Sequence, residues 1–380
     1  MRFLGFEGEW ERKKLGEIAE IVTGSTPPTN DSSFYNGDFL FVSPSDIQTH
    51  RHISQTKTTL TEKGFKIGRK IRSGSSLFVC IGSTIGKVGQ VKKECVTNQQ
   101  INSVISDDNN DDNFIFSLLE HNSLKIKELS AEQAVPIINK TTFSNFKIII
   151  PNLPEQTKIA LFLLHIDKRI TTQMKIIEEL EKLIRGLQEQ IFSQKLRFKD
   201  ENGNEFAEWE EKKIGELFKV TRGKVLPMNL ITEKCNKKMS YPVYSSQTKN
   251  NGLAGYYNEF LFENAITWTT DGANAGKVHY RKGKFYCTNV CGVLLNEDGY
   301  ANICIAQIIN SISKSYVSYV GNPKLMNNVM SEINILTPSL LEQQKIANFL
   351  SLINQKFDTE RQLLSKYQNQ KKFLLQNMFI

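Results

Sequence analysis

Two glycine-rich segments, each ending in a lysine, have the clearest potential for binding chemistry in this chain. Gly82-x-x-x-Gly86-Lys87-Val88 and Gly272-x-x-x-Gly276-Lys277-Val278 share one spacing. A nucleotide-binding P-loop needs four residues between its glycines and Ser or Thr after the lysine, so neither segment is one. We predict a tight turn after a strand, which presents a lysine and backbone N–H groups to an anion. A purely structural hairpin is the alternative.

Basic side chains are concentrated in short stretches of this chain, whose net charge is +8. Residues 57–72 contain six Lys or Arg and one Glu, and residues 277–284 contain four Lys or Arg and no acidic residue. In the first half, Lys87, Lys92 and Lys93 stand at and after the glycine-rich segment, at the position that the 277–284 cluster has in the second half. Such clusters fit a surface that follows phosphates, and a solvated basic face is the alternative for either one alone.

Residue types that usually carry catalysis do not recur between the two halves of the chain. The five histidines and six cysteines occupy different places in each half. Cys287-x-x-x-Cys291 lacks a second Cys or His pair at zinc-ligand spacing. A methyltransferase motif of the Asn-Pro-Pro-Tyr type is absent, and Asn322-Pro323-Lys324 is its nearest match. We therefore expect a protein that is not an enzyme, with reduced cysteines and no metal.

Three blocks of sequence occur twice, in the same order. EWERKKLGE at 9–17 returns as EWEEKKIGE at 208–216. The glycine-rich segments follow, each with a downstream Thr-Asn, and Pro-x-Leu-x-Glu-Gln-x-Lys-Ile-Ala-x-Phe-Leu begins at Pro151 and at Pro338. Between the blocks the halves differ, as in 34–70 against 229–262. This internal repeat indicates one scaffold with two specificities.

A heptad pattern follows the third block in each half. Apolar residues recur at steps of three and four from Ile159 to Ile191, and the same register runs from Ile346 to Met378. Proline before the pattern and a carboxylate in the first turn are typical of helix starts. At 1.5 Å per residue each helix would span on the order of 60 Å, which suits a spacer.

The two predicted helices can cover each other's apolar seams by pairing antiparallel. The pseudo-two-fold axis then lies near Lys175 and Gln362, with Gln173 beside Leu364 and Ile177 beside Glu360. We hypothesise that the polar residues Gln173 and Glu360, which interrupt the two seams, fix the register of the coiled coil.

Short apolar runs bounded by Gly, Asn, Ser and Pro predict strands at 39–42, 76–81, 146–150, 241–244, 265–268 and 292–295. One helix is expected in each half, at 114–129 and 303–318. The expected boundaries are 1–150 for a first domain, 151–199 for the first long helix, 200–338 for a second domain and 339–380 for the second long helix. No run approaches the 18 apolar residues of a membrane helix and no secretory signal is seen, so we expect a cytoplasmic protein with no membrane contact.

The whole chain resembles the specificity subunit of type I restriction-modification systems. The three repeated blocks carry the resemblance, together with Tyr241-Pro242-Val243-Tyr244 and Gly252-x-x-Gly255-Tyr256. In place of the Tyr-Pro-Val-Tyr segment, the first half has Phe41-Val42-Ser43-Pro44. This difference is expected if the two domains read different DNA sequences. The resemblance implies an α+β fold in which two target-recognition domains, mixed and mostly β with short helices, alternate with two long helices that pair as an antiparallel coiled coil.

The resemblance also implies a non-catalytic adaptor in defence against foreign DNA. Each domain would read one half of a bipartite, asymmetric double-stranded DNA target, while the helices fix the half-site spacing and dock two modification (methyltransferase) subunits. S-adenosylmethionine, ATP and Mg would be bound by partner subunits, including the restriction/translocase subunits, and none by this chain. Two alternatives are the specificity component of a bipartite type II system and a coiled-coil protein-binding scaffold without DNA selectivity.

Asn, Gln, Ser, Lys and Arg are the residue types that read base edges and bind phosphates. We predict DNA contacts in the first domain from Lys57, Lys63, Lys66, Arg69, Lys70, Lys87, Lys92 and Lys93. In the second domain we predict them from Ser245, Ser246, Gln247, Lys249, Asn250, Asn274, Lys277, Arg281, Lys282 and Lys284. The sequence does not separate base readers from phosphate contacts, and it does not give the target.

Overall fold

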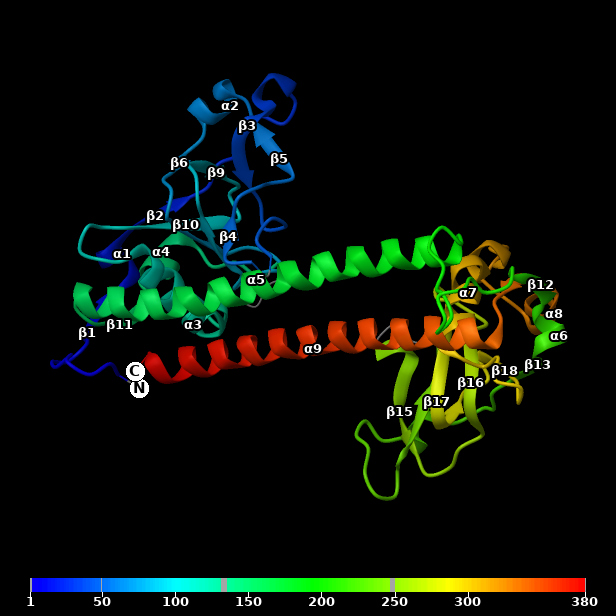
Figure 1. Cartoon of the computed structure of the whole chain (residues 1–380). Helices are drawn as coiled ribbons and strands as arrows, with labels where there is room; N and C mark the ends of the chain where they lie inside the picture. Colours follow the sequence, from blue (N-terminus) through cyan, green and yellow to red (C-terminus); the bar gives the residue numbers. More distant parts are fainter. Residues whose placement is uncertain (1, 49, 131–134, 247–249, 380) are drawn as a thin grey trace. The chain divides into compact units, whose positions relative to one another are not determined.

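The computed structural model describes residues 2–48, 50–130, 135–246 and 250–379. These residues form two compact units, each of which combines a globular domain with part of each long helix. Unit 1 consists of Met1–Glu178 with Glu360–Ile380, and unit 2 of Glu179–Thr359. The long helices are α5 (Leu153–Phe192) and α9 (Leu340–Met378) (Figure 1). Both helices predicted from the heptad pattern are therefore present.

The domain of unit 1 is mostly β. Its strands are β1 (Glu11–Lys14), β2 (Ala19–Thr23), β3 (Tyr35–Val42), β4 (His52–Ile53), β5 (Thr58–Leu60), β6 (Lys70–Ile71), β7 (Ser76–Val79), β8 (Val88–Val91), β9 (Cys95–Thr97), β10 (Ile101–Ser106) and β11 (Lys147–Ile150). Its helices are α1 (Leu15–Ile18), α2 (Glu62–Ile67), α3 (Asp112–Lys127) and α4 (Lys140–Ser144). One sheet has the order β2-β10-β7-β8-β4, another β5-β3-β9-β6, and β1 pairs with β11.

The domain of unit 2 repeats this plan with a different interior. Its strands are β12 (Glu210–Lys213), β13 (Lys219–Arg222), β14 (Tyr241–Tyr244), β15 (Leu253–Tyr257), β16 (Phe262–Thr269), β17 (Val278–Cys287), β18 (Cys291–Leu295) and β19 (Asn334–Thr337). Its helices are α6 (Ile214–Leu217), α7 (Ile303–Ile312) and α8 (Asn327–Glu332). The main sheet has the order β13-β18-β16-β17-β14-β15, and β12 pairs with β19.

The predicted strands and the first predicted short helix are confirmed, but the helix expected at 303–318 is shorter. α7 ends at Ile312, and a 3-10 turn follows over Ser313–Tyr316. The Ser311 hydroxyl donates to the Ile308 carbonyl at 2.7 Å, and Ser315 to Ile312 at 2.6 Å. Such local side-chain bonds compete with a continuing helix. No helix among the described residues is long and apolar enough to cross a membrane.

The first repeated block closes each domain on itself. β1 pairs antiparallel with β11, with Lys14 opposite Lys147, and β12 pairs with β19, with Lys213 opposite Asn334. Because β11 and β19 lead directly into α5 and α9, the opening strand of each domain is joined to the strand that enters its long helix. This explains why the block recurs in both halves: its role is to close the scaffold.

The Glu-Gln pair of the third block is buried and bonded at the start of each long helix. In unit 1, Arg2 donates twice to Glu155, both at 2.7 Å, and in unit 2 Arg197 donates to Glu342 at 2.9 and 3.3 Å. Trp209 Nε1 also donates to Glu342, at 3.0 Å. The following glutamine donates to the proline carbonyl that begins the block, at 2.9 Å in unit 1 and 2.8 Å in unit 2. The sequence suggested only a favourable helix dipole, whereas the structure shows an ion pair that anchors each helix.

Each hydrophobic core includes residues from the end of a long helix. In unit 1, Phe78, Phe114 and Phe143 pack with residues from the end of α9, namely Leu374, Leu375, Met378 and Phe379. In unit 2, Ile191 from the end of α5 packs with Trp268, Ile305 and the start of α9. A long helix thus begins against one domain core and contributes its last turns to the other.

The helices are antiparallel in unit 1, as expected, and the two polar residues of the seams, Gln173 and Glu360, are bonded to each other. Lys371 contacts Asp167 at 2.6 Å, and further along α5 Gln173 donates to the Glu360 side chain at 2.5 Å and to its carbonyl at 3.2 Å. The Asp167–Lys371 contact agrees within one residue with the register expected from the sequence, in which Gln173 lies beside Leu364, and the Gln173 side chain reaches Glu360 one turn along α9. A buried amide and a buried carboxylate each need a hydrogen-bond partner, and this requirement favours joining the two polar residues directly.

Candidate nucleic-acid interface

The two glycine-rich turns have the same backbone structure. Each first glycine donates to a proline carbonyl, Gly82 to Pro136 at 3.0 Å and Gly272 to Pro323 at 2.9 Å. The glycines have φ values between 83° and 95°, the left-handed region in which a side chain is strained. The amide of each lysine is also bonded within the turn, to Thr84 or Asn274. Because these N–H groups are already bonded, the lysine side chain is the part of the turn that can meet an anion.

In the first domain, half of the predicted contacts gather around α2 and β6. Lys63 and Lys66 lie on α2, Arg69 follows it and Lys70 opens β6, and all four are exposed. Phe65 of α2 stacks on Phe39 at 4.3 Å between ring centres. Figure 1 shows α2, β3 and β5 grouped at the end of unit 1 remote from α5.

Some of these cations already have partners. Lys66 pairs with Glu62 at 2.7 Å, Lys63 donates to the Ser33 hydroxyl at 2.7 Å, and the Arg69 guanidinium donates to the Thr23 carbonyl at 2.8 Å. Each of these bonds is exposed, so a phosphate can compete for the cation.

The other predicted residues of the first domain lie elsewhere on it. Lys57 precedes β5, and Lys92 and Lys93 lie in the β8–β9 connection, all exposed. Lys87 is half-buried at the end of its turn, where the neighbouring Gly86 faces the α3 residues Ser123 and Lys127. The structure therefore separates Lys87 from the α2 group.

In the second domain, several predicted residues meet at the loop that follows β14. Ser245 bonds to the Thr288 hydroxyl at 3.0 Å, and Asn274 of the glycine-rich turn donates to the Ser246 carbonyl at 3.1 Å. These residues and Lys277 are half-buried, while Asn250 is exposed with φ of 51°. Gln247 and Lys249 lie outside the described residues. Ser245, Asn274 and Lys277 line one pocket and form a polar surface there.

Arg281 lies beneath this surface. It is 8% exposed, stacks over Tyr244 at 3.7 Å, and donates to Asn251 at 2.8 Å and to Thr267 at 3.1 Å. Burial lowers its pKa from the ordinary value, and burial also lowers the pKa of the neighbouring His279 to about 3. This arrangement suits a residue that holds the loop in place from below.

Lys282 and Lys284 lie further along β17. Both are exposed, and Lys284 lies 4.6 Å from the ring centre of Phe260. They form a second basic site on this domain, apart from the Ser245 loop.

The topology reveals a loop that sequence reasoning missed in the first domain. β3 pairs parallel with β9 at Val42, and β14 pairs parallel with β17 at Tyr244, so the segments that follow Val42 and Tyr244 are equivalent. The loop after Val42 contains Ser43 and Ser45, and Asp46 accepts from the Ser43 hydroxyl at 2.6 Å. The departure of the first half from the Pro-Val-Tyr pattern was the signal that could have marked it.

Metal-binding groups and thiols are the remaining side chains that could carry chemistry. Among the described residues, no group of three His, Cys, Asp or Glu side chains could hold a metal ion. All six cysteines, which lie within the described part of the chain, are free thiols, and burial raises the pKa of Cys291 to about 11. The thiol form of Cys291 is therefore favoured at neutral pH.

Comparison with known proteins gives one consistent family. The model of the type I restriction modification DNA specificity domain matches residues 7–182 and 207–368. A type I restriction enzyme MjaIX specificity subunit from Methanocaldococcus jannaschii is 24% identical over 385 residues, covering 92% of this chain and 87% of that protein. A putative type I specificity subunit N-terminus from Mycoplasma pneumoniae is 39% identical over 141 residues, covering 36% of this chain and 74% of that protein.

Solved structures show the same fold. The crystal structure of a type I restriction-modification system S subunit from M. genitalium has a TM-score of 0.68 at 18% identity and covers 100% of this chain and 98% of that chain. A chain from a structure that describes complex assembly and conformational transition of the type I R-M system has a TM-score of 0.57 at 16% identity, covering 98% of each chain. At these identities the likeness establishes the fold.

Proposed function

Because the chain belongs to the type I restriction-modification DNA specificity family, matched in both of its halves, we propose that it is the non-catalytic subunit that selects the DNA target of a methyltransferase complex. Each domain reads one half of a bipartite, asymmetric target. α5 and α9 set the distance between the half-sites and dock two modification subunits. The observation that carries the proposal is one scaffold built twice around unlike interiors.

The unlike interiors lie where selectivity is needed. The equivalent loops after β3 and β14 carry Ser43, Ser45 and Asp46 in one domain, and Ser245, Ser246 and Asn250 in the other. Hydroxyl and amide groups both donate and accept hydrogen bonds, and a carboxylate accepts them, so the two loops present different patterns to base edges. Different patterns at equivalent places support the reading of different half-sites.

The repeated lysines suit a different role. A residue that recurs in both domains cannot distinguish two unlike half-sites, so we assign Lys87 and Lys277 to the phosphate backbone, which is the same in every sequence. The exposed cations around α2 and on β17 add to the electrostatic attraction between the protein and the phosphate backbone. On this proposal Arg281 supports the reading loop from beneath and does not contact bases.

The proposal assigns the covalent chemistry to partner subunits. The modification subunits bind S-adenosylmethionine and methylate adenine, and the restriction/translocase subunits bind ATP and Mg. Support for this division comes from the domain interiors, which offer hydrogen-bonding and basic side chains without a repeated catalytic set.

Sequencing of modified bases across the genome, with and without the gene, tests the proposal. We expect one bipartite motif with methylated adenines to lose its methylation in the deletion strain. Replacing residues 241–287 by the equivalent segment of another family member should change one half of that motif and leave the other half and the spacing intact. A methylome that is unchanged by deletion, in cells that express the protein, would contradict the function.

Co-purification identifies the partner independently. The tagged full-length protein should retain a methyltransferase subunit, identified by mass spectrometry. Recovery of other proteins alone, with no sequence-selective DNA binding by the recovered complex, would favour a scaffold.

A further inference from the structure

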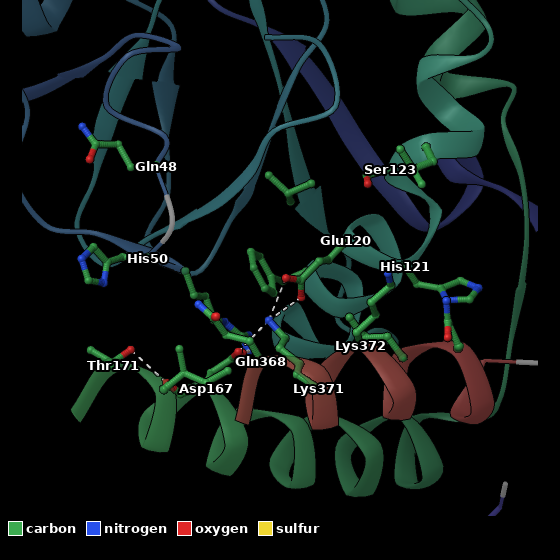
Figure 2. A pocket seen from close by; sticks show the side chains of 17 residues that line it. Gln48, His50, Glu120, His121, Ser123, Asp167, Thr171, Gln368, Lys371 and Lys372 are labelled. Carbon is green, nitrogen blue, oxygen red and sulfur yellow. Dashed lines mark hydrogen bonds and ion pairs between the residues drawn. The ribbon is translucent and has the colours of Figure 1, made fainter. Parts of the chain in front are cut away.

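A pocket of 440 Å³ in unit 1 lies where the domain meets α5 and α9, and charged side chains line its wall (Figure 2). Arg51 donates to Asp167 at 2.8 Å, and Asp167 also pairs with Lys371 at 2.6 Å. Lys371 in turn pairs with Glu120 at 2.6 Å. Figure 2 shows Lys371 of α9 between Glu120 and Asp167, with dashed lines that mark its ion pairs.

The network joins four separate parts of unit 1. Arg51 comes from the segment between β3 and β4, Glu120 from α3, Asp167 from α5 and Lys371 from α9. The Arg51 guanidinium also donates to Gln90 at 2.9 Å and to the Asn113 side chain at 2.8 Å. The recognition domain is thereby bonded to both long helices.

The charges of this network are largely removed from water. Arg51 and Asp167 are each 6% exposed, and the Glu120 Oε2 atom is shielded from solvent. Arg51 and Lys371 both lie over the Phe116 ring, at 4.2 and 5.6 Å. Removing one member would leave the others as buried charges with fewer partners, which is strongly unfavourable. A rotation of the domain on the helices would have the same effect.

Unit 2 does not repeat these charges. Alignment of the third sequence block places Asn354 and Ile184 at the positions of Asp167 and Lys371. Alignment of α3 and α7 through their N-cap residues, Asp111 and Asn302, places Ser311 at the position of Glu120. Three of the four members of the network, Glu120, Asp167 and Lys371, therefore lack a charged counterpart in unit 2.

We propose that Arg51, Glu120, Asp167 and Lys371 are positioning residues, which hold the first recognition domain in one orientation on the helix pair and so restrict the half-site spacing that the protein accepts. This inference rests on the proposed function. Apolar contact is non-directional, whereas a buried ionic network is satisfied only when its geometry is kept. Charge pairing thus adds an orientational restraint to the helix anchors at Glu155 and Glu342, which both units share.

The test uses the full complex and the target found by methylome sequencing. Lys371→Met combined with Glu120→Gln removes one arm of the network, keeps the net charge, and leaves Asp167 paired with Arg51. The readout is the ratio of binding constants for the natural target and for a target whose spacer is one base pair longer. We expect the ratio to fall by about tenfold, within the range of coupling between contacting residues.

The matched control applies the same substitutions to an exposed pair in unit 2. Lys213→Met with Glu332→Gln disrupts an ion pair of 2.7 Å whose side chains are 48% and 68% exposed, and should leave the ratio unchanged. A second variant, Arg51→Lys, keeps the positive charge. The lysine ammonium cannot bond to Gln90, Asn113 and Asp167 together, as the planar guanidinium does. We expect it to lower the ratio as well.

The outcomes separate the two proposals. An equal loss of affinity on both spacers, with the ratio kept in both network variants, would mean that the network only stabilises the fold and would overturn the inference. Absence of sequence-selective binding by the unsubstituted complex would instead overturn the proposed function, and this inference with it.

Discussion

The hydrogen bond between Gln173 and Glu360 predicts strong coupling between the two residues. Gln173 is 5% exposed and Glu360 9%, and the amide donates to the carboxylate at 2.5 Å. Gln173→Leu removes a donor from a buried carboxylate, and Glu360→Leu removes an acceptor from a buried amide. The double variant removes both polar groups together and leaves an apolar seam.

The expected free energies follow from the cost of burying polar groups. A hydrogen bond to a charged group contributes about 1.5–3 kcal/mol, and we expect each single variant to lose roughly this much stability. Replacing both partners by apolar residues is often nearly neutral. The coupling should therefore be about 3 kcal/mol or more, well above the roughly 0.3–0.5 kcal/mol error of additivity.

Urea unfolding of the two single variants, the double variant and the unsubstituted protein measures this coupling. The exposed pair Gln344 and Asn348, joined at 2.9 Å on α9, provides the control, because its replacement by Leu should show little coupling. We also expect the double variant to stay folded but to show altered crosslinking between α5 and α9, since the residues that specify register are gone. Additive losses in the double variant, or unchanged crosslinking, would refute the reasoning.

Three further predictions concern the scaffold and the turns. Lys87→Ala or Lys277→Ala should weaken binding to all sequences alike and reduce the salt slope by about one; unchanged affinity and slope would show that the turn is only structural. Burial lowers the pKa of His279 to about 3, so the folded protein disfavours its protonation. The contribution of the neutral His279 to stability is therefore fully present above about pH 6.5 and is lost as the pH falls toward 3. We expect the melting temperature of the His279→Gln variant to depend less on pH over this range. Glu342→Gln should lower the free energy of unfolding, measured in urea, by roughly 1.5–3 kcal/mol more than Glu155→Gln does, because Glu342 also accepts a hydrogen bond from the Trp209 indole. Equal losses of unfolding free energy in the two variants would contradict this.

Local sequence patterns predicted the long helices and part of the sheets, because these signals were local or repeated. The heptads predicted α5 and α9, and the short apolar runs predicted β3, β7, β11, β14, β16 and β18. The seam alone did not indicate that the Gln173 side chain would bond to Glu360, because a repeating seam permits several side-chain pairings at each position. Arg281 was selected as a cation on a basic strand, and nothing in its neighbours indicated that Tyr244 and Asn251 would cover it.

Long-range polar contacts were outside the reach of sequence patterns. Arg51, Asp167 and Lys371 belong to distant segments, and none stands in a repeated block. The topological equivalence of the loops after Val42 and Tyr244 also required the sheet order, because their sequences share little.

The repeat itself separates scaffold from selectivity. Residues that recur, such as the Glu-Gln pair and the glycines of the turns, bond mainly within the domain that contains them. Their bonds are already made, so their recurrence reflects how each module is built. On the proposed function, the loops after β3 and β14, which differ between the modules, distinguish one half-site from the other. The Arg51 network then holds the first domain in place. Exchanging the repeated residues between the halves should therefore leave the target unchanged, whereas exchanging the loops should alter it.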